Sequence, residues 1–243
     1  TEQWAQFAVA GPNSRLLLQK IVDKKFNISN ENFPLMACSE ISICGGILAR
    51  LFRISFSGEL AYEIAVPSRY GNSLMELLIE AGKEYNATPY GTEALGVMRI
   101  EKGHAAGNEL NGQTTAQNLG MENFLSKSKD YIGKTLSERP GLNLDDKLVL
   151  MGFEPVDKSQ TLTAGSHFIN LNKDYILKND QGWLSSVAYS PTLGHSIGIG
   201  FIKMGKKRVG EIVKAVDMLN NNFTDVKIVS PHFVDPNGEK LRA

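Results

Sequence analysis

The chain has 243 residues, of which 42% are hydrophobic and 21% are charged, as in ordinary globular proteins. Its 26 Lys and Arg balance its 26 Asp and Glu, so no basic excess favours nucleic acid or an anionic membrane as a partner. It shows no signal-like leader and no run of about 20 apolar residues, so we expect a cytoplasmic protein without a membrane partner. It begins without Met, and we expect it to be a piece of a longer polypeptide.

The chain opens with a strand-to-helix pattern. Residues 7–10 have strand preference and end at a break, Gly11-Pro12. Asn13 or Ser14 can then cap a helix. The apolar side of this helix carries Leu16, Leu17, Leu18 and Ile21.

The next strand pattern, residues 41–56, is interrupted by a Gly45-Gly46 turn. The only two cysteines, Cys38 and Cys44, belong to this alternating region. Their spacing does not fit zinc binding, and no second pair completes a tetrad. We therefore expect buried free thiols in a reducing compartment.

A period-2 pattern on both sides of Ser57-Gly58 predicts a β-hairpin from Leu51 to Glu63. Glu63 should face away from the large apolar residues of its own strand, on the side of Ala61 and Ala65. These small neighbours leave room for a flat ligand, and a carboxylate accepts two side-by-side hydrogen bonds. The alternative is a Glu63 that pairs with a Lys or Arg, or is simply solvated. The alternating residues of the hairpin are Phe52, Ile54, Phe56, Leu60, Tyr62 and Ile64.

Two helical patterns follow, Arg69–Tyr85 and Gly91–Gly103. Arg99 lies at the margin of the apolar face of the second helix. Its planar guanidinium could bind a ligand carboxylate or carbonyl. The alternative is a salt bridge to Glu93 or Glu101.

The sequence pattern changes in the second half of the chain, where short segments with strand preference predominate. Residues 107–118 form a polar stretch that we expect to be an ordered loop. A short helix is expected at Asp130–Arg139, and residues 140–146 are the best linker. Beyond the linker, strand patterns recur at the spacing of an antiparallel barrel, in Leu148–Phe153, Thr161–Ile169, Gly182–Tyr189, Ser196–Ile202, Arg208–Met218 and Asp225–Ser230.

The glycines between Gly194 and Gly200 alternate with isoleucines and no helix follows, so they fail the dinucleotide-binding fingerprint. We expect them to allow close backbone packing. The four histidines have no metal-ligand spacing, so no metal site is predicted. No serine has the context of an acyl-transfer nucleophile.

Three blocks of sequence resemble the glycine cleavage T-protein (aminomethyltransferase) family. They are SFSGELAYEI around Glu63, ALGVMRIEKGH from Ala94 to His104, and SVAYSPTLGHSIGIGFI from Ser186 to Ile202. Further blocks, including GNELNGQTTAQN and PHFVDPNGEKLR, resemble one branch, the alpha subunits of heterotetrameric sarcosine oxidases. The resemblance covers nearly the whole chain.

The resemblance implies an α+β fold: an incomplete T-protein-like folate-binding region over residues 1–140, then an antiparallel β-barrel over residues 145–243. It implies that Glu63 binds the pterin of tetrahydrofolate and that Arg99 contacts the folate. Phe56, where the family often has Tyr, and Tyr62 would shape the walls. The catalytic Asp of the family is expected upstream, so no catalytic residue is assigned within this chain.

The resemblance also implies an activity: conversion of the imine from sarcosine oxidation, with tetrahydrofolate, into glycine and 5,10-methylenetetrahydrofolate. The other oxidase subunits would be partners, and FAD, FMN and NAD would bind elsewhere in the complex. The fragment alone would be inactive. Two alternatives remain: a free-standing aminomethyltransferase acting on a lipoyl carrier, and a non-catalytic folate-fold scaffold.

Overall fold

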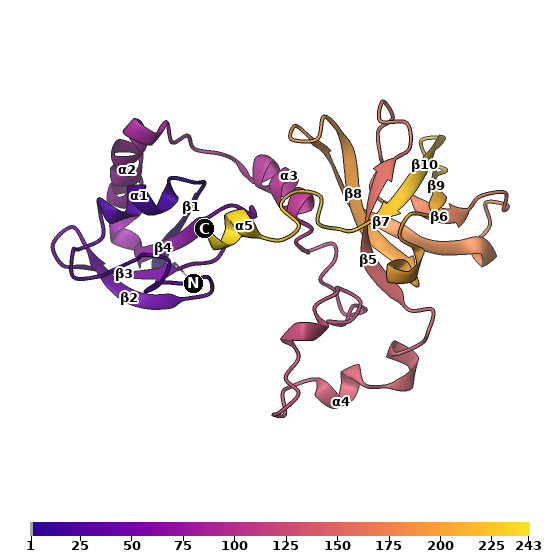
Figure 1. Cartoon of the computed structure of the whole chain (residues 1–243), viewed down its shortest axis with the longest axis horizontal. Coiled ribbons are helices and arrows are strands. Elements are labelled where there is room, and N and C mark those ends of the chain that lie inside the picture. The colour runs from indigo at the N-terminus through magenta and orange to yellow at the C-terminus, as the bar shows by residue number, and fades with distance from the viewer. Residues whose placement is uncertain (1) are drawn as a thin grey trace. The chain divides into compact units, whose positions relative to one another are not determined.

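The computed structural model describes residues 2–243, which fall into two compact units (Figure 1). Unit 1 comprises the chain up to Leu95 together with the tail Asp235–Ala243, and unit 2 comprises Gly96–Val234. The linker expected at residues 140–146 lies inside unit 2 in this division, together with the rest of Gly96–Val234. Where the domain boundary lies stays a prediction.

Unit 1 is built on an antiparallel four-stranded sheet with the order β1-β4-β3-β2. Its strands are β1 (Trp4–Ala10), β2 (Cys38–Ile43), β3 (Ile47–Phe52) and β4 (Ala61–Pro67). Two helices contact the sheet, and the tail adds a short third; they are α1 (Ser14–Gln19), α2 (Gly71–Gly82) and α5 (Glu239–Arg242). The helix α3 (Thr92–Lys102) begins in unit 1 and continues into unit 2.

The core of unit 1 lies between the sheet and the helices α1 and α2. Alternate residues of β4, Tyr62, Ile64 and Val66, are fully buried there, and Leu18 and Leu74 of the helices pack in the same cluster. The residues between them lie on the opposite face of the sheet, where Ala61 and Ala65 are also buried. Those residues include Glu63.

The predicted hairpin is confirmed in its pairing but not in its extent. β3 and β4 are antiparallel neighbours, with Phe52 opposite Glu63. Residues 53–60, however, form an irregular loop and not two strand arms around a tight turn. The side chain of Arg53 is fully buried and donates to the carbonyl oxygen of Phe33 at 2.8 Å, which takes the chain out of the strand path.

The prediction that the two cysteines are buried is wrong. Cys38 and Cys44 are both free and exposed. Cys38 lies on β2, an edge strand, opposite Phe52, and Cys44 lies in the turn between β2 and β3 with a positive φ of 51°. An edge strand and its turn leave such side chains in solvent, because nothing covers them from outside.

The β2–β3 turn is held by Asp23, whose carboxylate accepts from the Ser42 hydroxyl at 2.5 Å and from the Gly45 amide at 2.7 Å. The Ser42 hydrogen bond, with help from Gly45, holds the pKa of Asp23 below its usual range. A lowered pKa gives stability that is present at neutral pH and is lost as the pH falls through the folded-state pKa.

We therefore expect Asp23→Asn to lower the melting temperature at pH 7 but to have little effect well below pH 4. The measurement is the melting temperature of both proteins from pH 7 down to acid. A difference between the two that does not shrink with acidification would contradict this role of the ionised carboxylate.

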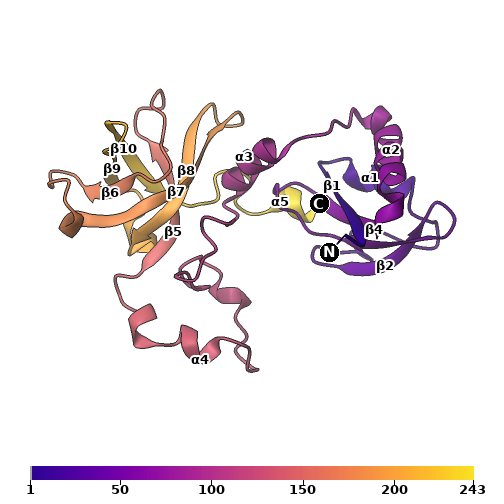
Figure 2. The ribbon, with the colours of Figure 1, turned by 180° about the vertical axis from the view of Figure 1, so that it is seen from behind.

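Unit 2 contains the predicted barrel, which is closed by six antiparallel strands in the order β10-β5-β8-β7-β6-β9 (Figure 2). The strands are β5 (Leu148–Pro155), β6 (His167–Asn170), β7 (Asp180–Ser190), β8 (His195–Lys203), β9 (Ile212–Asp217) and β10 (Asn222–Val229). All six predicted strands are present, although β6 begins six residues later than Thr161. Phe153 and Phe168 stack inside the barrel with ring centroids 4.0 Å apart.

The barrel glycines have the role predicted for them. A Cβ atom on Gly198 would lie 2.8 Å from a methyl carbon of Leu184, and one on Gly200 would lie 2.3 Å from the carbonyl oxygen of Trp183. β7 and β8 can pair closely only because these side chains are absent.

The segment between α3 and the barrel is irregular but ordered. It includes the short helix α4 (Lys134–Ser137), which lies within the predicted Asp130–Arg139. Asn118 fixes the polar loop to the barrel, since its side chain donates to Leu148 and its carbonyl oxygen accepts from the Leu150 amide. The α+β fold with a C-terminal barrel is thus confirmed.

Candidate functional site

Glu63 lies in the middle of β4, on the face of the sheet opposite the helices. Its register partners are Ala8 on β1 and Phe52 on β3, and the same strand places Ala61 and Ala65 on its face. Three alanines on two strands therefore surround the carboxylate: the predicted Ala61 and Ala65, and Ala8, which the sequence pattern did not indicate. Small side chains beside an acceptor leave space for a flat ring.

The Glu63 carboxylate is oriented by Gln6, whose side-chain amide donates a hydrogen bond to Oε2. Gln6 lies on β1 one pair away from Glu63, opposite Ala65, so both side chains are on the open face. Neither of the alternatives considered for Glu63, a Lys or Arg partner or full exposure, describes this arrangement, since Glu63 is half-buried with an uncharged donor.

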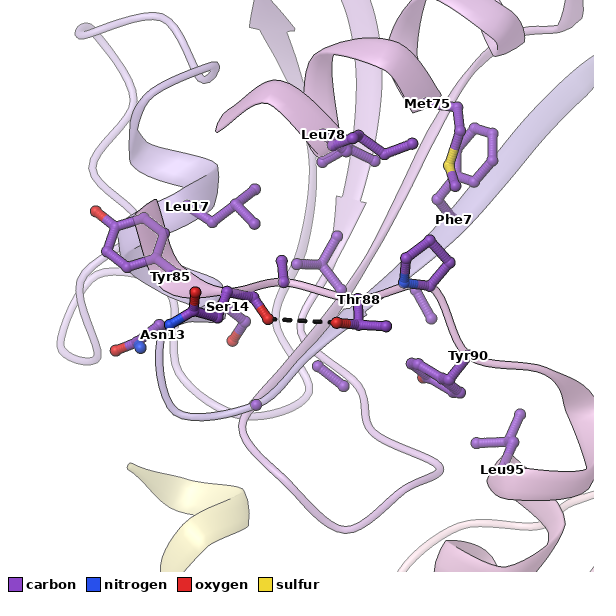
Figure 3. Close-up of a pocket in the computed structure, with 18 of the residues that line it drawn as sticks. Phe7, Asn13, Ser14, Leu17, Met75, Leu78, Tyr85, Thr88, Tyr90 and Leu95 are labelled. Carbon is purple, nitrogen blue, oxygen red and sulfur yellow. Dashed lines mark hydrogen bonds between the residues drawn. The ribbon is translucent and has the colours of Figure 1, made fainter. Parts of the chain in front are cut away.

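A pocket of about 690 Å³ opens in unit 1 beside β1 (Figure 3). Gln6 is one of its lining residues, and Glu63 is not. Its wall is largely apolar, and Figure 3 shows Met75 lying against the ring of Phe7. Its polar lining residues include Asn13, Ser14, Tyr85, Thr88 and Tyr90.

Tyr90 connects this pocket electrostatically to Glu63. Burial raises the pKa of the Tyr90 phenol, and the negative charge of Glu63 raises it further. The phenol therefore stays protonated at neutral pH and can donate a hydrogen bond. Sequence reasoning missed Gln6 and Tyr90; the only available signal was the position of Tyr90 just before the block that begins at Ala94.

The other predicted wall residues lie apart from Glu63. Tyr62 is fully buried on the helix side of the sheet, where its hydroxyl accepts from Arg15 Nε at 2.8 Å. Phe56 lies in the loop between β3 and β4 and is 38% exposed. The structure therefore does not bring the Tyr62 and Glu63 side chains together, although they are neighbours in sequence.

Arg99 belongs to unit 2, where its guanidinium is buried. Nη1 donates to Glu109 Oε2 at 2.9 Å and Nη2 donates to the Ser186 hydroxyl at 2.7 Å. The salt bridge considered as an alternative to ligand binding therefore exists, but its partner is Glu109 and not Glu93 or Glu101. A ligand would have to share the guanidinium with these acceptors.

Glu109 is fully buried and saturated with donors. Besides Arg99, it accepts from the Ala106 amide at 2.9 Å and from the hydroxyls of Ser185 and Ser186 at 2.5 and 2.7 Å. The two serines lie at a register shift in β7, which allows adjacent hydroxyls to reach one carboxylate. Glu109 and its partners fasten the polar loop to the barrel.

Two family models match the chain. The model described as the GCVT N-terminal domain matches residues 1–129, and the glycine cleavage T-protein C-terminal barrel domain matches residues 149–235. The chain belongs to the glycine cleavage T-protein family. In this T-protein-family chain, Glu63 and Arg99 fall within the first match and the barrel accounts for the second.

Among curated relatives, the chain is similar to the sarcosine oxidase subunits alpha of Rhizobium meliloti (strain 1021) and Corynebacterium sp. (strain P-1). It is 45% and 39% identical to them over 99% of its length, and it spans 24% and 25% of theirs. It is 28% identical to an aminomethyltransferase of Thermoanaerobacter sp. (strain X514), of which it spans 62%. The resemblance to sarcosine oxidase alpha subunits is thus confirmed, for about a quarter of their length.

The fold is also that of a solved structure, the glycine cleavage system aminomethyltransferase T from Bartonella henselae. The TM-score is 0.70 over 96% of this chain and 60% of the other, at 19% identity. In residues 2–243, no helix is long and apolar enough to cross a membrane. The same residues contain no cluster of three or more His, Cys, Asp or Glu suited to a metal ion.

Proposed function

We propose that this chain is the tetrahydrofolate-binding domain of an enzyme of the sarcosine oxidase alpha-subunit type. The observation that carries the proposal is the Glu63 carboxylate, held by Gln6 on an open sheet face between alanines. The reduced pterin ring of tetrahydrofolate is flat and presents a ring N–H beside an exocyclic amine. A carboxylate accepts both donors in a charge-assisted pair.

The neighbouring pocket supports a ligand of this size. A volume of about 690 Å³ lies within the range of small-molecule sites. Its apolar wall suits the aromatic part of a folate, and the Tyr90 phenol, whose pKa is raised by burial and by the charge of Glu63, can donate a hydrogen bond. Phe56 and Arg99 stay proposed folate contacts, and Tyr62 supports the strand that carries Glu63.

The proposed reaction is transfer of a one-carbon unit. Sarcosine oxidation at a flavin elsewhere in the enzyme would supply an imine, and FAD, FMN and NAD would bind to other domains or subunits. Tetrahydrofolate supplies the nitrogen nucleophiles that take the methylene carbon as glycine leaves. This chain contributes positioning, which can be worth about 7–11 kcal/mol in favourable cases, and no catalytic residue is assigned to it.

A free-standing aminomethyltransferase is the second candidate. The identity of 28% to such an enzyme, over 99% of this chain, favours it. The identities of 39–45% to sarcosine oxidase alpha subunits over the same residues favour the first candidate more. A non-catalytic scaffold would not need an oriented carboxylate on an open face.

The test is Glu63→Gln in the assembled enzyme. We expect folate affinity to fall by roughly 10- to 100-fold, the equivalent of about 1.5–3 kcal/mol for hydrogen bonds to a charged group. Sarcosine-dependent peroxide formation should persist, because the flavin site is elsewhere. Titration calorimetry with tetrahydrofolate measures the affinity.

Glu40→Gln is the matched control, since Glu40 is an exposed carboxylate on β2 and belongs to the same sheet face. Its folate affinity should equal that of the wild type. An unchanged affinity in Glu63→Gln, or an equal loss in both variants, would remove Glu63 from the folate site.

A further inference from the structure

An arginine without an assigned role lies on the same face of the sheet as Glu63. Arg50 on β3 is opposite Ala65 of β4. Two positions earlier on β4, Glu63 is opposite Phe52, so Arg50 and Glu63 are diagonal neighbours. Such neighbours are about 7–8 Å apart, a distance that a long side chain can span. An ion pair between them is therefore within reach, and it would occupy the carboxylate that folate needs.

The structure places the Arg50 guanidinium away from Glu63. Its Cζ lies 4.0 Å from the centre of the Trp4 ring. Trp4 is on β1, across β4 from Arg50, and it is opposite Pro67, farther along β4 from Glu63. Glu40 contributes little to this position, because its Oε1 is 3.7 Å from Arg50 Nε and both side chains are exposed. Tryptophan is the best ring for binding a guanidinium through its face, so Trp4 holds Arg50.

We propose that Trp4 is a positioning residue, whose ring keeps Arg50 away from Glu63 and so leaves the carboxylate free for a ligand. Gln6, which is uncharged, is the donor that orients Glu63 instead. A neutral donor does not offset the negative charge, so a ligand with two neighbouring N–H groups can still bind in a charge-assisted pair. This role of Trp4 rests on the proposed function, in which that ligand is tetrahydrofolate.

The experiment measures the affinity of the assembled enzyme for tetrahydrofolate by titration calorimetry. Trp4→Ala should release Arg50 to pair with Glu63 and lower the affinity about fivefold, the effect of a favourable ion pair at a partly exposed site. Adding Arg50→Gln to Trp4→Ala removes the competing cation and should restore the wild-type affinity. Trp4→Phe keeps a ring for the guanidinium and should bind as the wild type does. A crystal structure of Trp4→Ala should show Arg50 within about 4 Å of Glu63.

Arg50→Gln alone is the matched control, and its folate affinity should equal that of the wild type. A loss in this single variant would mean that Arg50 contacts the ligand, and it would overturn the role of Trp4. An unchanged affinity in Trp4→Ala, or a loss that Arg50→Gln does not rescue, would also overturn it. In each of these cases the loss expected for Glu63→Gln can still be observed, so the folate site would stand. An unchanged affinity in Glu63→Gln would overturn both.

Discussion

Replacing Glu109 with Ala should lower the free energy of unfolding of unit 2 by about 3–5 kcal/mol, the usual result of removing one partner of a buried ion pair. Glu109 has no exposed surface, and Arg99 is only 8% exposed. The substitution leaves the guanidinium of Arg99 without a counter-charge and the Ser186 hydroxyl without its acceptor, while the Ser185 hydroxyl keeps only the Ile199 carbonyl oxygen. Urea unfolding followed by circular dichroism measures the change.

The matched control is Glu93→Ala, which removes an exposed carboxylate near the start of α3 and should change stability by less than about 0.5 kcal/mol. The double variant Arg99→Met with Glu109→Leu should recover part of the loss, because neither charge is then left unpaired. A loss below about 1 kcal/mol in Glu109→Ala would show that the buried pair does not hold the polar loop.

Gly200→Ala should destabilise the barrel by about 3 kcal/mol, at the upper end of the usual cost of overpacking. The added Cβ would lie 2.3 Å from the carbonyl oxygen of Trp183 and 2.8 Å from the Cα of Leu184. Both atoms are backbone, so no side-chain rotation can relieve the contact, and β7 would have to move away from β8. Thermal unfolding in the near-ultraviolet, where Trp183 contributes, reports on this pair of strands.

Gly141→Ala is the appropriate control, since a Cβ there meets no atom within 4 Å and Gly141 has no positive φ. Its melting temperature should match that of the wild type. Equal melting temperatures for Gly200→Ala and the control would mean that the strands can separate at little cost.

Local periodicity was sufficient to predict the strands of the barrel and the side of β4 on which Glu63 lies. Both depend on the alternation of large apolar residues with other residues along a single strand, and this alternation is visible in the sequence itself. The packing role of Gly200 was predictable for the same reason, because it alternates with isoleucines. The exposure of Cys38 was not, since it depends on β2 being an edge strand.

The partners of Arg99 and Glu63 could not be found from local pattern. Glu109 lies ten positions after Arg99 in a loop without periodicity, and Ser186 lies 87 positions away. Gln6 reaches Glu63 across 57 positions because β1 pairs with β4. The alternatives considered for Arg99 were acidic residues of its own predicted helix, Glu93 and Glu101, whereas its partner Glu109 lies in the loop beyond that helix.

The tail Asp235–Ala243 belongs to unit 1, and this has a consequence for folding. Arg53 donates a hydrogen bond to the main-chain oxygen of Ala243, which lies 190 positions further along the chain, and all of unit 2 lies between them in sequence. Contacts between residues so far apart form slowly, because a long loop has to close before they can be made. The last contacts of unit 1 therefore wait for a segment that follows the whole of unit 2.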